Sequence, residues 1–255
     1  MLKVIKYVMM DILRSRVVAA YTIFLLAISL SIFNLEDNSA KGLLSMLNII
    51  LIIVPLVSLI FSTIYMYNSV EFIELLLSQP IQRTRLLFSI YSGLCLSMII
   101  SFAIGAGIPM MLLEGSSTAL IMTLTGLVLT AVFVSLAVLG TIITRDKAKG
   151  IGIAIMIWLF FSLLYDGLIL LIMFQFSDYP LEKAMVIFCS LNPVDLSRIL
   201  ILLKLDISAM MGYTGAVFNQ LLGNNSGIIY SSFVIVLWIL IPLFVALRKF
   251  RRKDL

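Results

Sequence analysis

Long apolar runs separated by short polar stretches dominate the pattern of hydrophobic and polar positions along this chain. A helix that crosses a bilayer needs about 20 predominantly apolar residues, and several of the runs reach that length. We therefore predict an all-α, polytopic membrane protein that forms one domain over residues 1–255. Its six predicted transmembrane helices are residues 17–35, 43–66, 86–112, 118–143, 150–176 and 228–247.

The segment before the first span, residues 1–16, is amphipathic. A helix of this kind lies in the plane of the membrane surface, with its apolar side against the lipid. We expect an N-terminal interfacial helix that leads into the first span. Its apolar side would hold Leu2, Ile5, Met9, Ile12 and Leu13, and its other side Lys3, Lys6, Met10 and Arg14.

Residues 70–79 are predicted to form a second amphipathic helix, which Pro80 ends. One face would meet a soluble partner while the other lies against the bilayer. The two faces are Glu71, Glu74 and Ser78, and Phe72, Leu75, Leu76 and Gln79. Arg83 and Arg85 follow the helix and suit an anionic membrane surface. This pattern favours a docking segment over a merely solvated helix face.

Composition and charge indicate how the chain is oriented. It is 62% hydrophobic, 12% charged and carries a net charge of +5. If both termini are cytoplasmic, 14 of the 18 lysines and arginines face the cytoplasm, and only Lys41, Lys183, Arg198 and Lys204 lie outside. This positive-inside bias predicts a protein of the cell inner membrane with cytoplasmic termini. We interpret the basic balance as orientation and expect no nucleic-acid partner.

Two further polar segments are candidate contact sites. The compact basic loop at residues 144–150 carries Arg145, Lys147 and Lys149, which we expect to touch the same cytoplasmic partner as residues 70–79. Residues 177–227 are predicted to form two or three short helices on the outer membrane surface. Asn192 and Pro193 would begin one of them. Its apolar stripe is Leu196, Ile199, Leu200 and Leu203, and the expected contacts with an outer partner are Asp195, Arg198, Lys204 and Tyr213.

The third span carries a small residue at every fourth position, at Ser89, Gly93, Ser97, Ser101 and Gly105. Helices in lipid associate closely where such residues line up, so we predict that this stripe packs against another helix. Pro109 is expected to bend or end the span near the outer surface.

Residues that would support catalysis are missing from the sequence. It has no histidine, no nucleophile elbow and no phosphate-binding loop, since the GSST segment at Gly115 lacks the required lysine. We predict that the chain is not an enzyme and binds neither a metal nor a cofactor directly. Cys95 and Cys189 give no disulfide framework and no zinc site.

Asp166 is the one acidic residue well inside a predicted span. A carboxylate in lipid is costly and raises the hypothesis of cation or proton handling. The alternative, which we favour, is that it hydrogen-bonds a Ser, Thr or Tyr on a neighbouring helix and fixes packing. The 14 methionines, including Met110, Met111, Met185, Met210 and Met211 on the outer side, similarly allow a copper(I) site or simple core filling. We favour core filling.

The string EFIELLLSQPIQRTRLLF, Glu71 to Phe88, resembles the cytoplasmic coupling segment of type-2 ABC exporter permeases. The segment from Asn192 to Phe218 is similar to that of NosY-like permeases, whose NosDFY complex matures the copper site of nitrous oxide reductase in denitrification. The resemblance implies a homodimer, a NosF-like partner ATPase that binds the ATP, and a periplasmic NosD-like copper-handling partner. It assigns ATPase coupling to Glu71, Phe72, Glu74, Leu75, Ser78, Arg83 and Arg85.

Two other functions remain open at this point. The chain could export a lipid, drug or peptide, or it could be a structural membrane anchor without energy coupling. An ATPase encoded beside a copper-handling protein, an ATPase alone, or neither would separate the three.

Overall fold

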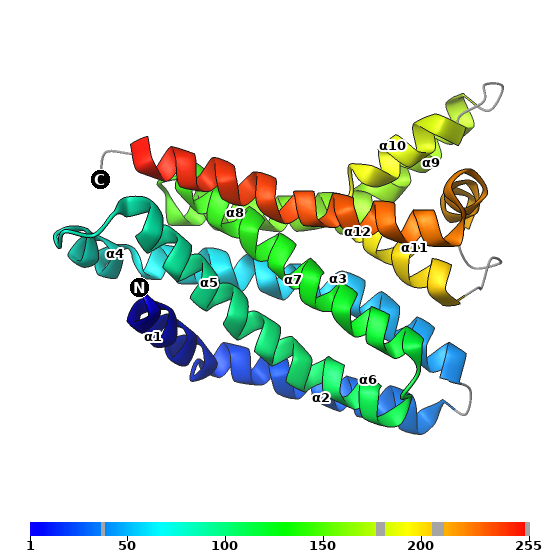
Figure 1. Cartoon of the computed structure of the whole chain (residues 1–255), viewed down its shortest axis with the longest axis horizontal. Helices are drawn as coiled ribbons and strands as arrows, with labels where there is room; N and C mark the ends of the chain where they lie inside the picture. The colour runs from blue at the N-terminus through cyan, green and yellow to red at the C-terminus, as the bar shows by residue number, and fades with distance from the viewer. Residues whose placement is uncertain (37–38, 177–181, 206–211, 253–255) are drawn as a thin grey trace.

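The computed structural model describes residues 1–36, 39–176, 182–205 and 212–252, and these form helices joined by short connections (Figure 1). No strand occurs among them. The helices are α1 (Leu2–Leu13), α2 (Arg16–Leu35), α3 (Ser39–Asn68), α4 (Val70–Leu77), α5 (Arg83–Phe102), α6 (Ile108–Leu113), α7 (Ser117–Ile143), α8 (Lys147–Leu159), α9 (Tyr165–Gln175), α10 (Glu182–Ser190), α11 (Pro193–Leu205) and α12 (Gly212–Arg252), with π-helical turns η1 (Ala103–Gly107) and η2 (Phe160–Leu164).

Six helical segments in the described residues are long and apolar enough to cross a membrane. They are Arg16–Leu35, Lys41–Asn68, Arg83–Leu113, Ser117–Ile143, Lys147–Gln175 and Ser226–Arg252. Each predicted span lies inside one of these segments to within one residue. The prediction of an all-α, multi-pass membrane protein is confirmed.

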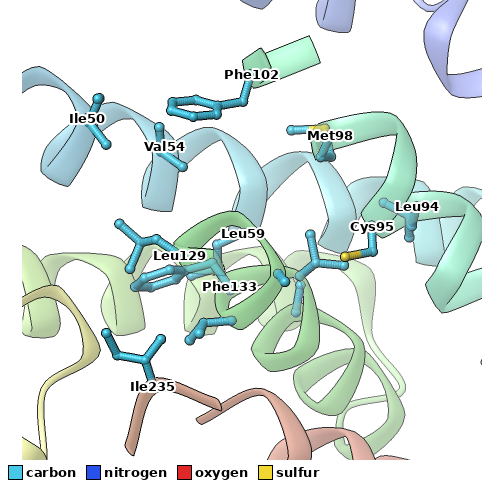
Figure 2. Packing of buried hydrophobic residues seen from close by; sticks show 14 of the residues in the cluster. Ile50, Val54, Leu59, Leu94, Cys95, Met98, Phe102, Leu129, Phe133 and Ile235 are labelled. Carbon is cyan, nitrogen blue, oxygen red and sulfur yellow. The ribbon is translucent and has the colours of Figure 1, made fainter. Parts of the chain in front are cut away.

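Helix α7 is the centre of the bundle. In its most apolar window 67% of the residues are buried, against 22% for α2 and 17% for the α8–η2–α9 span. It packs on α3, α5, α11 and α12, and Figure 2 shows the resulting core, in which Leu129 and Phe133 of α7 lie among side chains of neighbouring helices. The thinly covered helices therefore form the outside of the bundle.

The small-residue stripe of α5 packs as predicted, and its partners are α1 and α2. A Cβ placed on Gly93 would lie 2.8 Å from Val8 Cγ1, and one on Gly105 would lie 2.9 Å from Leu25 Cβ. The close approach of α1 corrects the expected apolar side of that helix. Val8 and Ile12 are its buried residues, and Val8 lies in the groove over Gly93. Leu2, predicted on the apolar side, is 81% exposed.

Pro109 does not end the third span, which continues to Leu113. The π-helical turn η1 comes directly before the α6 segment that holds Pro109. Proline removes one backbone donor and crowds the preceding turn, and a π-turn re-registers the hydrogen bonds at such a point. The helix therefore passes the proline with an irregular turn.

The described residues of the segment predicted to lie on the outer surface are mostly helical, and among them α11 is packed into the bundle. It contacts α7 and α12, and residues of its predicted stripe such as Leu196 and Leu203 are buried. Helix α10 meets α11 at a bend of 110°. Gly223 has a φ of 68° and marks a kink inside α12. The apolar stripe predicted for this helix thus packs on protein, since it contacts α7 and α12.

Both termini of the described chain and α4 lie at the same end of the bundle, which we call the α4 end (Figure 1). Helices α6 and α10 lie toward the opposite end.

Candidate functional site

Helix α4 is attached to the bundle through one apolar side. Its central residue Ile73 is 5% exposed, and the Phe72 ring stacks on Tyr7 of α1 with the ring centroids 5.3 Å apart. Leu76 and Leu77 are partly buried against the core. Burying such side chains against protein removes apolar surface from water and holds this eight-residue helix in place.

Ile73, which the predicted apolar face did not include, is the buried residue of α4. Leu75 and Gln79, predicted to lie against the bilayer, are not covered by protein. The sequence holds a signal for Ile73, because it lies three and four positions before Leu76 and Leu77, the spacing of one helical face.

The exposed side of α4 is a stripe made of Glu71, Glu74, Leu75 and Ser78, which we call the α4 stripe. Glu74 and Leu75 each lie three or four positions from both Glu71 and Ser78, so the four share one face. Leu75 is 69% exposed, and the Ser78 hydroxyl donates to the Leu75 carbonyl oxygen at 2.8 Å. The α4 stripe thus presents an exposed apolar side chain, flanked by two carboxylates, on the surface of the α4 end.

A cavity of about 340 Å³ opens beside α4, at the junction with the ends of α3, α7 and α12. Glu74 of α4 and Arg145 of the α7–α8 connection both line it. Its floor is apolar and includes Ile73, Ile142 and Phe250. The structure therefore brings the two predicted contact segments, residues 70–79 and 144–150, to one cavity.

Hydrogen bonds hold the α7–α8 connection against α3. The Tyr67 hydroxyl lies 2.6 Å from Thr144 Oγ1, and Lys147 Nζ donates to Asn68 Oδ1 at 2.7 Å. The Lys149 backbone N–H donates to Asp146 Oδ1, which caps α8. Arg145, Lys147 and Lys149 are all exposed, but Lys147 already has a partner within the chain, so Arg145 is the basic residue that faces the cavity.

Arg83 and Arg85 lie in the first turn of α5, after the connection that follows α4. Both side chains are exposed at the α4 end. They do not line the cavity beside α4.

At the opposite end, Asp166 of α9 pairs with Arg198 of α11, with 2.8 Å between Oδ2 and Nη1. Arg198 also lies 3.5 Å from Asp195 Oδ1. Asn192 accepts from the Val194 N–H and donates to the Phe161 carbonyl, so it caps α11 and ties it to the fifth span. The packing interpretation of Asp166 gains support, although its partner is an arginine and not the expected hydroxyl.

Asp195 is 7% exposed, so it is not a surface residue in this arrangement. Its helix segment Pro193–Lys204 forms, together with Ala184–Ser190, a bent apolar pair that has the composition of a broken span or a re-entrant loop. Asp166 is the closer of the two carboxylates around Arg198, at 2.8 Å against 3.5 Å for Asp195. Lys204 is exposed, whereas the side chain of Tyr213 lies outside the described residues.

Replacing Arg198 is expected to destabilise the protein more than replacing Asp195. Arg198→Met leaves the Asp166 carboxylate without its partner, which should lower the Tm by roughly 2–4 °C, about 1 kcal/mol for a half-exposed pair. Asp195→Asn keeps a side chain of the same shape and leaves the closer Asp166–Arg198 pair in place, so it should leave the Tm nearly unchanged. Thermal unfolding in detergent compares the two variants. An equal loss in both would contradict the ranking of Asp166 above Asp195 as the partner of Arg198.

The described residues contain no group of three or more His, Cys, Asp or Glu side chains placed to hold a metal ion. Cys95 and Cys189 are both buried and unpaired with each other. Of the outer-side methionines, Met110 and Met185 are buried and Met111 is partly exposed, while Met210 and Met211 lie outside the described residues. The buried ones fill core positions, as methionine commonly does.

Comparison with known proteins gives a family for the whole chain. The family model described as ABC-2 family transporter protein matches residues 4–255. No curated protein matches the chain. The family match includes α4, the α7–α8 connection and the α9–α11 region together, and the chain therefore belongs to the ABC-2 family of transporter membrane proteins.

Proposed function

We propose that the chain is the energy-coupled permease subunit of an ABC complex, in which the α4 stripe and the α7–α8 connection receive a partner ATPase. Family membership supports a membrane subunit with an ATPase partner. The observation that carries the site assignment is the shared cavity, which both Glu74 and Arg145 line beside an exposed acidic and apolar stripe. ATP would be bound and hydrolysed by the partner, not by this chain.

In this proposal the α4 end faces the cytoplasm and the chain lies in the cell inner membrane with both termini inside. The distribution of the lysines and arginines supports this orientation, since 14 of 18 fall in the segments on that side. Two copies would form the working unit. Helix α2 and the α8–η2–α9 span are the faces available for pairing, because less than a quarter of their apolar windows is buried within one copy.

Movement would pass from α4 through the spans as largely rigid bodies. Helix α4 follows α3 after a single residue, and α3 packs on the central α7, which in turn contacts α11. The pair Asp166–Arg198 links α11 to the fifth span. A push on α4 would thus reach α10 and α11 through packed helices.

We further propose that the outer partner is a NosD-like copper-handling protein and that the complex serves maturation of the copper site of nitrous oxide reductase. This finer assignment rests on the resemblance of Asn192 to Phe218 to NosY-like permeases. The outer contact would involve Arg198, Lys204 and Tyr213, with Asp195 reachable only if α11 moves, since it is buried. Copper would be held by the partner.

Export of a lipid, drug or peptide is the second candidate. It is favoured by a groove of about 710 Å³ between α1, α2 and α3. Apolar residues such as Leu56, Ile60 and Ile64 line the groove, with Arg14 and Asn68 among its polar members. Such a groove fits an amphipathic substrate at the level of a membrane surface.

A mild-detergent pull-down of the tagged protein, with copurifying subunits identified by mass spectrometry, tests these functions. We expect an ATPase together with a periplasmic copper-handling protein, the second lost when Arg198 and Lys204 are replaced by glutamate. An ATPase alone would favour the exporter. Recovery of no ATPase from a wild-type sample that is folded by gel filtration would contradict energy coupling and favour the structural anchor.

A further inference from the structure

A second cavity at the α4 end lies between the first turn of α5 and the last turns of α12. Its volume is about 330 Å³, and it is lined by Thr84, Phe244, Leu247, Arg248, Arg251 and Arg252. Half of these lining residues are arginines, and none is acidic. We call this the arginine cleft.

The arginine cleft has a graded character along α12. Phe244 and Leu247 come first, and Arg248, Arg251 and Arg252 follow within two turns on the same side of the helix. At 1.5 Å per residue, the distance along the axis from Phe244 to Arg252 is about 12 Å. One face of the helix therefore changes from apolar to cationic over the depth that separates acyl chains from headgroups.

The cleft also lies where two membrane spans end. Arg83–Leu113 begins one residue before Thr84, and Ser226–Arg252 ends at Arg252. The start of the third span and the end of the last span thus reach the membrane surface at the cleft. Basic pockets between transmembrane helices at this level are typical binding sites for anionic lipid headgroups.

The cationic groups of the cleft have no carboxylate partner among the residues that the structure describes. The ion pairs found there join Arg198 to Asp166 and Asp195, at the other end of the molecule. Arg248, Arg251 and Arg252 are all exposed. Guanidinium groups bind phosphate oxygens through paired N–H donors, so three of them around one cavity are complementary to a phosphate group.

We propose that the arginine cleft binds the headgroup of one anionic phospholipid, whose phosphate lies among Arg248, Arg251 and Arg252 and whose acyl chain lies over Phe244 and Leu247. The apolar floor selects a lipid over a free phosphate ion. Phe244 is 64% exposed, and a soluble anion would leave it uncovered. Thr84, in the first turn of α5, lines the same cavity and carries a hydroxyl that can donate to a phosphate.

A bound lipid would join α5 to α12 at the end where α4 is attached. Helix α5 follows α4 in the chain, and Phe250 of α12 lines the cavity beside α4. The lipid would therefore steady α12, which forms one wall of the cavity beside α4, and the start of α5, which follows α4. The proposal itself depends only on the membrane location of the chain and holds whether or not an ATPase docks there.

Native mass spectrometry of the delipidated protein in detergent, titrated with phosphatidylglycerol, tests the site. The variant Arg248→Gln/Arg251→Gln/Arg252→Gln should bind this lipid at least tenfold more weakly than the wild type. The control Lys3→Gln/Lys6→Gln/Arg16→Gln removes the same charge from exposed positions at the same end, outside the cleft. The control should bind phosphatidylglycerol with an affinity within twofold of that of the wild type. The wild type should bind phosphatidylcholine at least tenfold more weakly than phosphatidylglycerol.

Three results would overturn the proposal. An equal loss of binding in the control variant would show general attraction to a basic surface. Displacement of the lipid by equimolar inorganic phosphate, with no effect of Phe244→Ser on lipid binding, would show a free-anion site. Unchanged lipid binding in the arginine variant, with loss of a copurifying protein, would make the cleft a protein contact. If the triple variant does not fold, the single variant Arg251→Gln replaces it in the test and is expected to weaken lipid binding severalfold.

Discussion

Reversal of both charges on the α4 stripe, as Glu71→Lys with Glu74→Lys, is expected to abolish stimulation of the partner ATPase. Both side chains are exposed and flank Leu75 on the face that points away from the bundle. Placing like charges across a docking surface costs several kcal/mol, and a loss of about 3 kcal/mol weakens association roughly a hundredfold. The fold should survive, because Ile73 and Phe72 hold α4 from the opposite side.

The measurement is ATP hydrolysis by the partner in the presence and absence of the reconstituted variant. Glu36→Lys with Glu114→Lys is the matched control. It makes the same change of charge at the ends of α2 and α6, which lie opposite the α4 end. The control should stimulate hydrolysis as the wild type does. Wild-type stimulation by the Glu71/Glu74 variant would remove the α4 stripe from the coupling mechanism.

A second large effect is expected from Gly126→Ala in α7. A Cβ at Gly126 would lie 2.6 Å from Phe102 Cε1, closer than side chains approach. Phe102 is fully buried beside Val54 and Ile50 of α3 (Figure 2), so its ring has no room to withdraw. Overpacking of this kind costs about 2 kcal/mol. For a chain of this length the Tm should fall by roughly 4–8 °C.

Gly140→Ala is the control for this change, because it lies in the same helix and its Cβ would meet nothing within 4 Å. Alanine stabilises a helix relative to glycine by about 0.5–1 kcal/mol, so the Tm of this variant should stay the same or rise slightly. Thermal unfolding of both variants can be followed by tryptophan fluorescence. Equal values of Tm would mean that Gly126 and Phe102 do not set the distance between α5 and α7.

The six spans were predictable because each is a single apolar run of sufficient length, and length is what a bilayer dictates. The contact of α5 with another helix was predictable for a similar reason, since Gly93 and Gly105 leave room that only a close neighbour fills. Which neighbour fills it depends on side chains far away in sequence. Val8 and Leu25 occupy those grooves, and nothing in the sequence around them predicts this.

The candidate sites were predictable in part. The exposed positions of α4 follow from helical spacing, but the placing of Glu74 and Arg145, which are 71 positions apart, around one cavity is a tertiary feature. The partner of Asp166 was missed because Arg198 belongs to α11, which the sequence placed on the membrane surface. An amphipathic stripe has the same sequence pattern whether lipid or protein covers it. The burial of α11 could therefore not be predicted from the sequence.

The central claim, that the ATPase docks on the α4 stripe, is tested most directly by site-specific photo-crosslinking in membranes that contain the partner. A photoreactive residue would replace Leu75 on α4 in one variant and Leu112 on α6, at the opposite end, in another; the two side chains are 69% and 78% exposed. We predict that the ATPase is captured from position 75 and not from position 112. Capture from position 112, or from neither position in a complex that still hydrolyses ATP, would contradict this account.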